Sequence, residues 1–169
     1  MTYNYPIRPQ QPADEAAVSA LHEKAFGPGR FARMAYRVRE ASKGPSIALT
    51  AWDGDELVGS IQLTAITIGG KPGAMLLGPL VVAPVYAGRG AGLRLIVQSI
   101  AEAHQQDARL IVLVGDLPYY SRAGFAVVPT GQILLPGPVD PSRMLAAELE
   151  PGALASFSGM IAADHDGYR

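Results

Sequence analysis

The sequence predicts a mixed α/β fold whose front half forms a largely antiparallel sheet. Three observations carry this prediction. Two helical patterns precede three consecutive strand patterns, the last of these strands enters a third helix through alternating glycines, and a further apolar strand follows that helix. Because strands joined by tight turns pair antiparallel, we expect the first three strands to form a meander.

The composition is typical of one globular domain. The chain has 169 residues, of which 49% are hydrophobic and 17% charged, so we expect a single domain over residues 1–169. A formal net charge of -1 provides no field to attract nucleic acid or an anionic membrane. The absence of cysteine excludes disulfides, thiolate nucleophiles and thiolate zinc sites. With no leader pattern and no apolar run of about 18 residues, we expect a cytoplasmic protein.

Two helical segments open the chain. Residues 12–26 begin with a proline and two acidic residues, which suit a helix start, and carry apolar residues at helical spacing. A Gly-Pro-Gly break separates them from residues 30–44, which end before Pro45. The apolar face expected for this second helix consists of Phe31, Met34, Ala35 and Val38.

Three strand patterns follow. Residues 46–52 and 56–68 flank an Asp-Gly-Asp turn, which predicts a β-hairpin. Residues 74–84 form the third pattern, after a glycine-rich turn. Proline cannot donate a hydrogen bond to a neighbouring strand, so Gly78-Pro79 inside this pattern predicts a bulge or a local splay.

The back half starts with a helix that faces the core. The apolar positions of its expected buried face are Leu93, Ile96, Val97 and Ile100. This helix is expected to end near Gln106, and residues 109–116 read as a buried strand. Residues 117–125 suit one or two helical turns, and residues 125–129 suit another strand. Residues 130–169 contain short strand or helix pieces whose order the sequence does not define.

The alternating glycines between strand and helix are typical of a phosphate site. The first N–H groups of a helix lack internal acceptors, and glycine lets a ligand approach the backbone closely. A nucleoside triphosphate loop is excluded, because no Gly-Lys-Ser or Gly-Lys-Thr follows these glycines. A dinucleotide fold is disfavoured, because Gly88-x-Gly90-x-Gly92 lacks the required spacing and the expected acidic residue about 20 positions on. A plain tight connection remains the alternative.

Two motifs in the chain resemble the GCN5-related N-acetyltransferase (GNAT) family, and within it small bacterial acetyltransferases with a Gly-Asp-x-x-Tyr-Tyr segment. The motifs are GPLVVAPVYAGRGAGLRLI and the later VLVGDLPYYSRAGF, and the resemblance covers most of the chain to Pro129. In that family a Leu-x-Val-x-Pro strand, here residues 80–84, precedes a loop that wraps the pyrophosphate of acetyl coenzyme A. The matching positions here are Ala87, Gly88, Arg89, Gly90, Ala91, Gly92 and then Leu93. The family usually has Gln or Arg at the position of Ala87, but backbone amides make the main pyrophosphate contacts.

The resemblance implies both a fold and a coenzyme site. The implied fold is a central mixed, mostly antiparallel sheet flanked by helices, with strands that splay at the coenzyme. Its motif-bearing core covers about residues 5–129, and residues 130–169 complete the domain. Acetyl coenzyme A is the implied co-substrate. Main-chain N–H groups of Leu80, Val81 and Val82 would bind its pantetheine arm or polarise its thioester.

Direct acetyl transfer to an amine also needs a proton donor for the departing thiolate. The resemblance assigns this role to Tyr120, four residues before Gly124, whose phenol is protonated at neutral pH because its usual pKa is about 10. Packing on the short helix is the alternative for Tyr120 and the preferred interpretation for Tyr119. Asp116 is the best-placed carboxylate for a general base, and capping of the short helix at Pro118 is its alternative role. A neutral amine or a water relay would need no base.

The acceptor is not defined by the sequence. Residues 30–43 carry five basic side chains against one acidic side chain, and a solvated face is the preferred interpretation. Any of them lining the cleft would favour an acceptor with a carboxylate or phosphate over a polyamine. Our leading hypothesis is an N-acetyltransferase acting on the primary amine of a small molecule or peptide. The alternative is a non-catalytic module that binds acyl coenzyme A.

Two further expectations concern metals and assembly. The three histidines form no cluster with metal-ligand spacing, so we expect no metal cofactor. A homodimer is compatible with the sequence, which does not define the oligomeric state.

Overall fold

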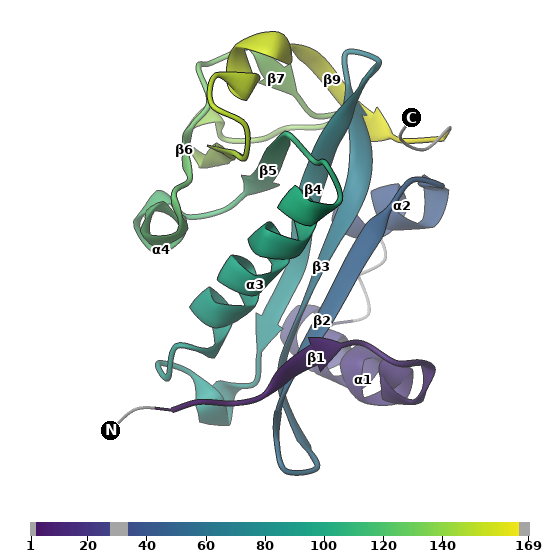
Figure 1. Ribbon diagram of the computed structural model, residues 1–169, viewed down its shortest axis with the longest axis vertical. Coiled ribbons are helices and arrows are strands. Elements are labelled where there is room, and N and C mark those ends of the chain that lie inside the picture. Colours follow the sequence, from purple (N-terminus) through teal and green to yellow (C-terminus); the bar gives the residue numbers. More distant parts are fainter. Residues whose placement is uncertain (1–2, 28–33, 166–169) are drawn as a thin grey trace.

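A central sheet organises the fold. The computed structural model describes residues 3–27 and 34–165, without the side chains of Met34 and Ala35. The strands are β1 (Ile7–Pro9), β2 (Ser46–Asp53), β3 (Glu56–Ile68), β4 (Lys71–Val82), β5 (Leu110–Val114), β6 (Ala126–Val127), β7 (Ile133–Leu134), β8 (Met144–Glu148) and β9 (Gly159–Ala163). They follow the order β1-β2-β3-β4-β5-β8-β6, with β9 paired to the end of β3 and to β7 (Figure 1). Only the pairs β4–β5 and β7–β9 are parallel among the described strands, so the predicted mixed, mostly antiparallel sheet is confirmed.

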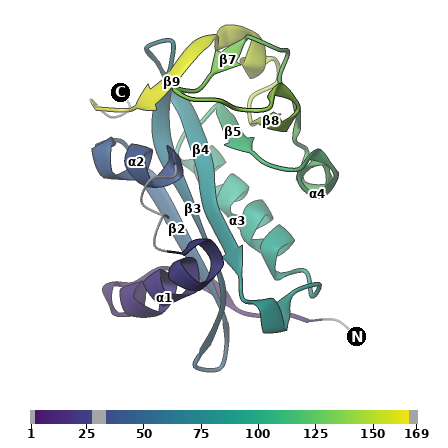
Figure 2. The same cartoon turned by 180° about the vertical axis from the view of Figure 1, so that it is seen from behind.

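Helices cover both faces of this sheet. α3 (Ala91–Gln105) lies on one face, and α1 (Glu15–Phe26) and α2 (Met34–Ala41) lie on the other (Figures 1 and 2). The short helix α4 (Leu117–Tyr120) follows β5. Two clusters of buried apolar side chains, one on each side, hold the layers together. Within residues 3–27 and 34–165, no helix is both long and apolar enough to cross a bilayer.

The helices and the hairpin of the front half lie where the sequence predicts them. β2 and β3 pair from Ser46 opposite Thr64 to Asp53 opposite Glu56. Gly54 in the turn has a φ of 59°, a left-handed conformation that glycine adopts without a steric penalty. α1 and α2 fall inside the two predicted segments, and Val38 of α2 is buried as expected. Phe31, expected on the same face, lies outside the described residues.

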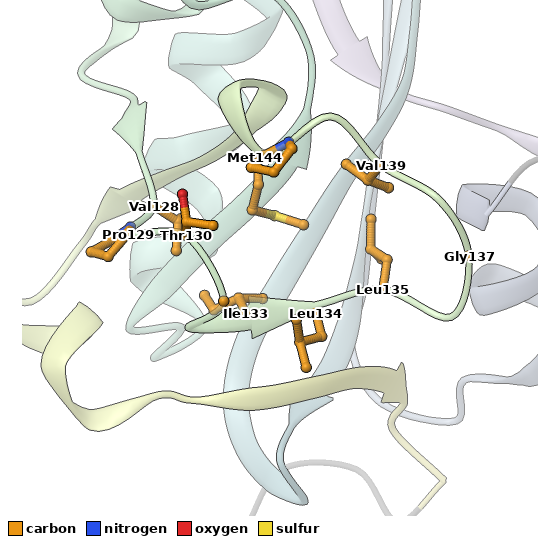
Figure 3. A pocket seen from close by; sticks show the side chains of 11 residues that line it. Val128, Pro129, Thr130, Ile133, Leu134, Leu135, Gly137, Val139 and Met144 are labelled. Carbon is orange, nitrogen blue, oxygen red and sulfur yellow. The ribbon is translucent and has the colours of Figure 1, made fainter.

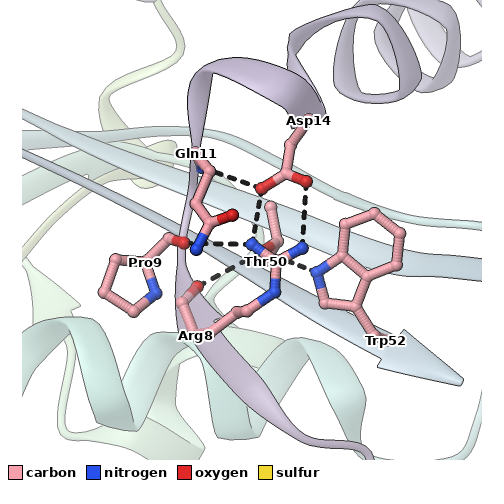
Figure 4. A network of polar contacts seen from close by, with 6 residues as sticks. All are labelled: Arg8, Pro9, Gln11, Asp14, Thr50 and Trp52. Carbon is pink, nitrogen blue, oxygen red and sulfur yellow. Dashed lines mark hydrogen bonds and ion pairs between the residues drawn. The ribbon is translucent and has the colours of Figure 1, made fainter. Parts of the chain in front are cut away.

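The short strand β1 was not predicted, and a polar network ties it to the rest of the fold. Arg8 contacts both carboxylate oxygens of Asp14, at 2.6 and 2.9 Å, and the backbone N–H of Gln11 donates to Asp14 at 2.8 Å (Figure 4). The Arg8 guanidinium holds the pKa of the buried Asp14 below its usual value. Arg8 also lies 4.7 Å above the ring of Trp52, on β2. The network therefore joins β1 to the start of α1 and to β2.

The buried face of α3 overlaps the face that its apolar spacing predicts, but the two are not the same. Its buried residues are Ala91, Gly92, Leu95, Ile96, Ser99 and Ala103. Val97 is 54% exposed, and Leu93 and Ile100 are half-buried, so the predicted face was wrong at Val97. Small residues such as Ser99 and Ala103 allow close packing of the helix, and a pattern of large apolar residues does not detect them.

β4 carries the predicted irregularity at Gly78-Pro79, and the sheet opens beside it. Ile61 pairs with Leu80 and Leu63 with Leu77, so two steps along β3 match three along β4, which is a β-bulge. On its other side, β4 pairs with β5 only over residues 74–76, and beyond them the two strands diverge (Figure 1). This opening is the local splay that the sequence predicts.

The C-terminal segment contributes a strand inside the sheet. β8 pairs antiparallel with β5, from Leu110 opposite Glu148 to Val114 opposite Met144. Its other side pairs with β6, the strand predicted over residues 125–129. The sequence did not reveal β8, because Met-Leu-Ala-Ala-Glu consists of residues that favour helices in isolation. Burial between β5 and β6 overrides that local preference.

Candidate active site

The glycine loop connects β4 to α3 and leaves open space above it. β4 ends at Val82, a short turn follows at residues 84–86, and α3 starts at Ala91. Gly88 and Gly90 have φ values of 75° and 84°, in the left-handed region. A Cβ atom built on either glycine would meet no other part of the described protein within 4 Å. The loop conformation requires glycine, and the space beside the loop can hold a ligand.

The backbone of this loop presents a row of hydrogen-bond donors. At the start of α3, the N–H of Arg94 donates to the carbonyl of Gly90 at 3.1 Å. Within the described residues, the N–H groups of residues 88–93 have no hydrogen-bond acceptor. Unpaired N–H groups at a helix start, with the positive end of the helix dipole, are suited to bind an anion such as a phosphate.

Side chains beneath the loop hold it in place. The Arg89 guanidinium donates to the hydroxyl of Tyr5 at 2.9 Å and lies 4.7 Å from the ring of Tyr3. Arg94 donates to the carbonyl of Tyr5 at 2.8 Å. The N-terminal segment therefore anchors the loop (Figure 1). Arg89, expected to bind the coenzyme, directs its side chain to these tyrosines, which leaves its backbone N–H to contribute to the donor row.

A second anchor lies under the turn that precedes the loop. The hydroxyl of Tyr86 donates to Glu56 at 2.7 Å and lies 3.1 Å from a carboxylate oxygen of Asp53. The hydrogen bond to Glu56, together with burial, raises the pKa of Tyr86. Both carboxylates belong to the β2–β3 hairpin, so this turn is tied to the front of the sheet as well.

A cleft of about 500 Å³ occupies the opening between β4 and β5. It is lined by Phe26, Leu76, Leu77, Gly78, Pro79, Leu80, Val114, Gly115, Asp116, Tyr119, Tyr120, Leu135, Val139 and Arg143. Leu80, predicted to bind the coenzyme, forms part of its wall; Val81 is buried and Val82 half-buried at the loop end of β4. Past Leu76 the β4 edge that faces the cleft has no strand partner among the described residues, so its backbone groups are available to a ligand.

Tyr120 lies in the cleft on α4. Its ring packs edge-on against Phe125, with 5.8 Å between the ring centroids, and lies against the backbone of Gly115, where a side chain would clash with it. Burial, with smaller contributions from Tyr119 and Asp116, raises the pKa of Tyr120 to about 12. The phenol is therefore protonated at neutral pH, in a residue that lines the cleft where the strands separate.

Tyr119 packs against the first turn of α3. A Cβ atom at Gly92 would clash with its hydroxyl oxygen and would touch Val82 at 3.4 Å. Burial raises the pKa of Tyr119, as it does for its neighbour. Gly92 therefore makes room for a side chain of this protein, whereas Gly88 and Gly90 border open space. The structure agrees with packing as the role of Tyr119.

Asp116 lies at the mouth of the cleft and does not cap α4 with its side chain. Its carbonyl accepts the first hydrogen bonds of that helix, from the N–H groups of Tyr119 and Tyr120. Its carboxylate, 77% exposed, lies 3.5 Å from Nε of Arg143. Asp116 is thus the N-cap residue of α4, the alternative role considered from the sequence, but it caps the helix with its backbone carbonyl and not with its side chain. Arg143 was missed because it lies in the C-terminal segment, whose strands the sequence did not define.

No metal site accompanies this cleft in the part of the chain that the structure describes. There, no three His, Asp or Glu side chains are grouped so that they could hold an ion. His22 is buried and contacts Ser60 and Tyr36, and His104 is exposed on α3.

Comparisons with known proteins place this geometry in context. Residues 6–128 match the family described as an acetyltransferase (GNAT) domain. An uncharacterized N-acetyltransferase, YjhQ of Escherichia coli, is 31% identical over 117 residues, which are 67% of this chain and 65% of the relative. The chain therefore spans slightly less than two thirds of that relative.

Solved structures show the same fold. The GNAT family N-acetyltransferase YhbS from Escherichia coli, in complex with CoA, superposes with a TM-score of 0.81 at 21% identity, covering 100% of this chain and 92% of the other. A GNAT family acetyltransferase from Brucella melitensis, in complex with acetyl-CoA, is 30% identical with a TM-score of 0.63, covering 86% of this chain and 96% of the other.

Proposed function

Because this chain belongs to the GNAT acetyltransferase family, we propose that it transfers the acetyl group of acetyl coenzyme A to a primary amine by direct attack. The observation that carries this proposal is the row of unpaired N–H groups over residues 88–93, which follows the strand whose other part lines a cleft with a protonated tyrosine. The family supports acetyl coenzyme A as the co-substrate, and structures of related proteins contain CoA or acetyl-CoA.

The coenzyme would bind along the loop and the free edge of β4. The N–H groups of residues 88–93 would bind the pyrophosphate, and the open space beside Gly88 and Gly90 would accommodate it. The pantetheine arm would follow β4, where a backbone N–H among Leu80, Val81 and Val82 would donate to the arm or to the thioester carbonyl. The opening between β4 and β5 supports this path, because paired strands would leave no donors for the arm.

Formation of the amide bond requires two proton transfers, one to the departing thiolate and one from the attacking amine. The amine nitrogen attacks the thioester carbonyl carbon, an amide C–N bond forms, and the C–S bond breaks. The departing thiolate takes a proton from the Tyr120 hydroxyl, which its raised pKa keeps protonated, and the phenolate is reprotonated from solvent. The amine gives its surplus proton to Asp116 or directly to water. Asp116 suits this role because its exposed carboxylate can pass the proton on to solvent.

The C-terminal segment belongs to the same functional unit in this proposal. β8 lies between β5 and β6, and Leu135, Val139 and Arg143 line the cleft. Residues 130–169 would thus complete a single domain whose acceptor side they help to form.

An assay of free thiol release tests the proposal. Because the chain has no cysteine, a thiol reagent reports only the coenzyme released from acetyl coenzyme A. We expect release that depends on enzyme and on an amine from a panel of amino acids, peptides, polyamines and aminoglycosides. Coenzyme binding without release across that panel would favour the non-catalytic acyl-coenzyme-A module instead. Absence of binding at millimolar acetyl coenzyme A would contradict both.

A further inference from the structure

The cleft beside Tyr120 combines apolar walls with one pair of opposite charges. Its apolar lining residues outside α4 include Phe26, Leu76, Leu80, Val114, Leu135 and Val139. Among its described lining residues, only Asp116 and Arg143 carry a charge at neutral pH. An acceptor that fills this space therefore meets mostly apolar surface and two charged groups of opposite sign.

The backbone holds the two charged residues side by side. Asp116 follows the end of β5 and Arg143 precedes the start of β8, and the N–H of Gly115 donates to the carbonyl of Arg143 at 3.0 Å. Nε of Arg143 lies 3.5 Å from the Asp116 carboxylate, a longer distance than that of a charge-assisted hydrogen bond, which is about 2.7–2.9 Å. An exposed pair of this kind contributes little to stability, so a ligand can replace the contact at small cost.

The apolar wall opposite is joined to the packed fold through Leu135. Leu135 and Val139 border the cleft and also border a smaller pocket of about 120 Å³, lined by Ile133 and Met144 among others (Figure 3). Ile133 and Met144 are buried, and they anchor the segment between β7 and β8 to the sheet. Leu135 packs against the same buried cluster, so this part of the wall is fixed to the packed fold and can select a ligand by shape.

From this arrangement, and resting on the proposed function, we infer that the acceptor is an apolar α-amino acid. Its amino group would lie against Asp116, its carboxylate against Arg143, and its side chain against Leu135 and Val139. An α-amino acid carries its two charged groups on one carbon, so it can satisfy both members of the close pair at once. A polycation does not fit, because the described lining offers one carboxylate and places an arginine beside it.

The charge pair also lies close to the group that would protonate the thiolate. Asp116 and Arg143 line the same cleft as Tyr120, where the charge of Asp116 raises and that of Arg143 lowers the pKa of Tyr120. An amine held by Asp116 would therefore lie within reach of a thioester whose sulfur faces Tyr120. Arg143 acts on the carboxylate of the acceptor and not on the reacting atoms, so it determines specificity.

Steady-state kinetics with matched acceptors tests this inference. We compare L-leucine with 3-methylbutylamine, which is leucine without its carboxylate, and use spermidine as the polycation. A charged hydrogen bond contributes about 1.5–3 kcal/mol, so we expect KM for leucine to be about ten- to a hundredfold lower than KM for 3-methylbutylamine. Arg143→Gln should bring the two KM values together, by raising KM for leucine relative to KM for 3-methylbutylamine by a similar factor. Arg122→Gln, at an exposed arginine that does not line the cleft, is the control and should change neither.

The outcomes separate this inference from the proposed function. Thiol release with spermidine or 3-methylbutylamine at least as efficient as with leucine would overturn the inference and leave the acetyltransferase intact. An Arg143→Gln effect of equal size on leucine and 3-methylbutylamine would also overturn it. Binding of acetyl coenzyme A with no release to any acceptor would overturn the inference and count against the proposed function.

Discussion

The hydroxyl of Tyr119 lies where a side chain at position 92 would have to be. Gly92 is in the first turn of α3 and Tyr119 is in α4, so the glycine lets the short helix dock against the start of the long one. This contact brings α4, and with it Tyr120, to the end of β4 where the coenzyme would bind. The third glycine of the loop thus has a packing role that differs from the role of the first two.

Gly92→Ala should destabilise the protein through this contact. The added methyl group would force the phenol of Tyr119 aside, and overpacking of this kind costs about 1–3 kcal/mol. In a Tyr119→Phe background the clashing oxygen is absent, and alanine is preferred over glycine within a helix by about 0.5–1 kcal/mol. Gly92→Ala should therefore be neutral or stabilising there. Urea unfolding of the wild type, both single variants and the double variant gives the four free energies of unfolding. If the effects of the two substitutions on that free energy are additive, the two residues are not in contact.

Gly90→Ala should weaken acetyl coenzyme A binding by about tenfold, because its Cβ would enter the space beside the donor row and left-handed backbone disfavours any side chain. Gly152 is a matched control: it has φ 82° and ψ 2° against φ 84° and ψ 1° at Gly90, precedes a helical turn, and also borders open space. Both substitutions should cost about 1–2 kcal/mol of stability. Isothermal titration should show weaker binding of acetyl coenzyme A only for Gly90→Ala. Equal affinities of the two variants would show that the pyrophosphate does not bind at this loop.

Tyr120→Phe should lower kcat by about 10²–10⁴-fold while leaving the affinity for acetyl coenzyme A almost unchanged. The ring and its packing on Phe125 remain, and the lost proton is needed only in the transition state. Tyr119→Phe, one position away in the same helix, should change kcat little. Wild-type turnover by Tyr120→Phe would assign the proton donor to water or another group and reduce Tyr120 to a packing residue.

The pH dependence of kcat should show no descending limb from Tyr120 up to pH 10. A general acid acts in its protonated form, so its contribution is lost only as the pH rises through its pKa. Burial moves that pKa to about 12 in Tyr120, above the usual tyrosine value of about 10. Rates measured from pH 7 to 10 should therefore stay level or rise as the acceptor amine loses its proton. A descending limb near pH 10 that disappears in Tyr120→Phe would show that the pKa of the Tyr120 phenol is not raised.

The sequence predicted those parts of the fold that local chemistry determines. The Asp-Gly turn fixed the β2–β3 hairpin, and a proline in an apolar strand pattern fixed the bulge at Gly78-Pro79. The alternating glycines located the loop whose backbone donors are unpaired in the structure. In each case one position needs either a left-handed backbone, which favours glycine, or a residue without a backbone N–H, which is proline.

The rest depends on contacts between distant segments. The buried face of α3 includes the small residues Ser99 and Ala103, so the spacing of large residues misplaced Val97. β8 is a strand because it lies between β5 and β6, although its residues favour helices. Arg143 reaches the cleft only through that pairing, which is why the acceptor side could not be derived from the chain alone.

The amide spectrum of the protein during titration with acetyl coenzyme A tests the central claim most directly. In a ¹⁵N-labelled sample, the amide signals of Gly88, Gly90 and their neighbours to Leu93 should shift most, because their N–H groups would bond the pyrophosphate. Leu80 and Val82 should follow as the pantetheine passes along β4, while Gly131 and Gly137, at the smaller pocket, should not move. Saturable shifts at the smaller pocket, with residues 88–93 unchanged, would contradict the account.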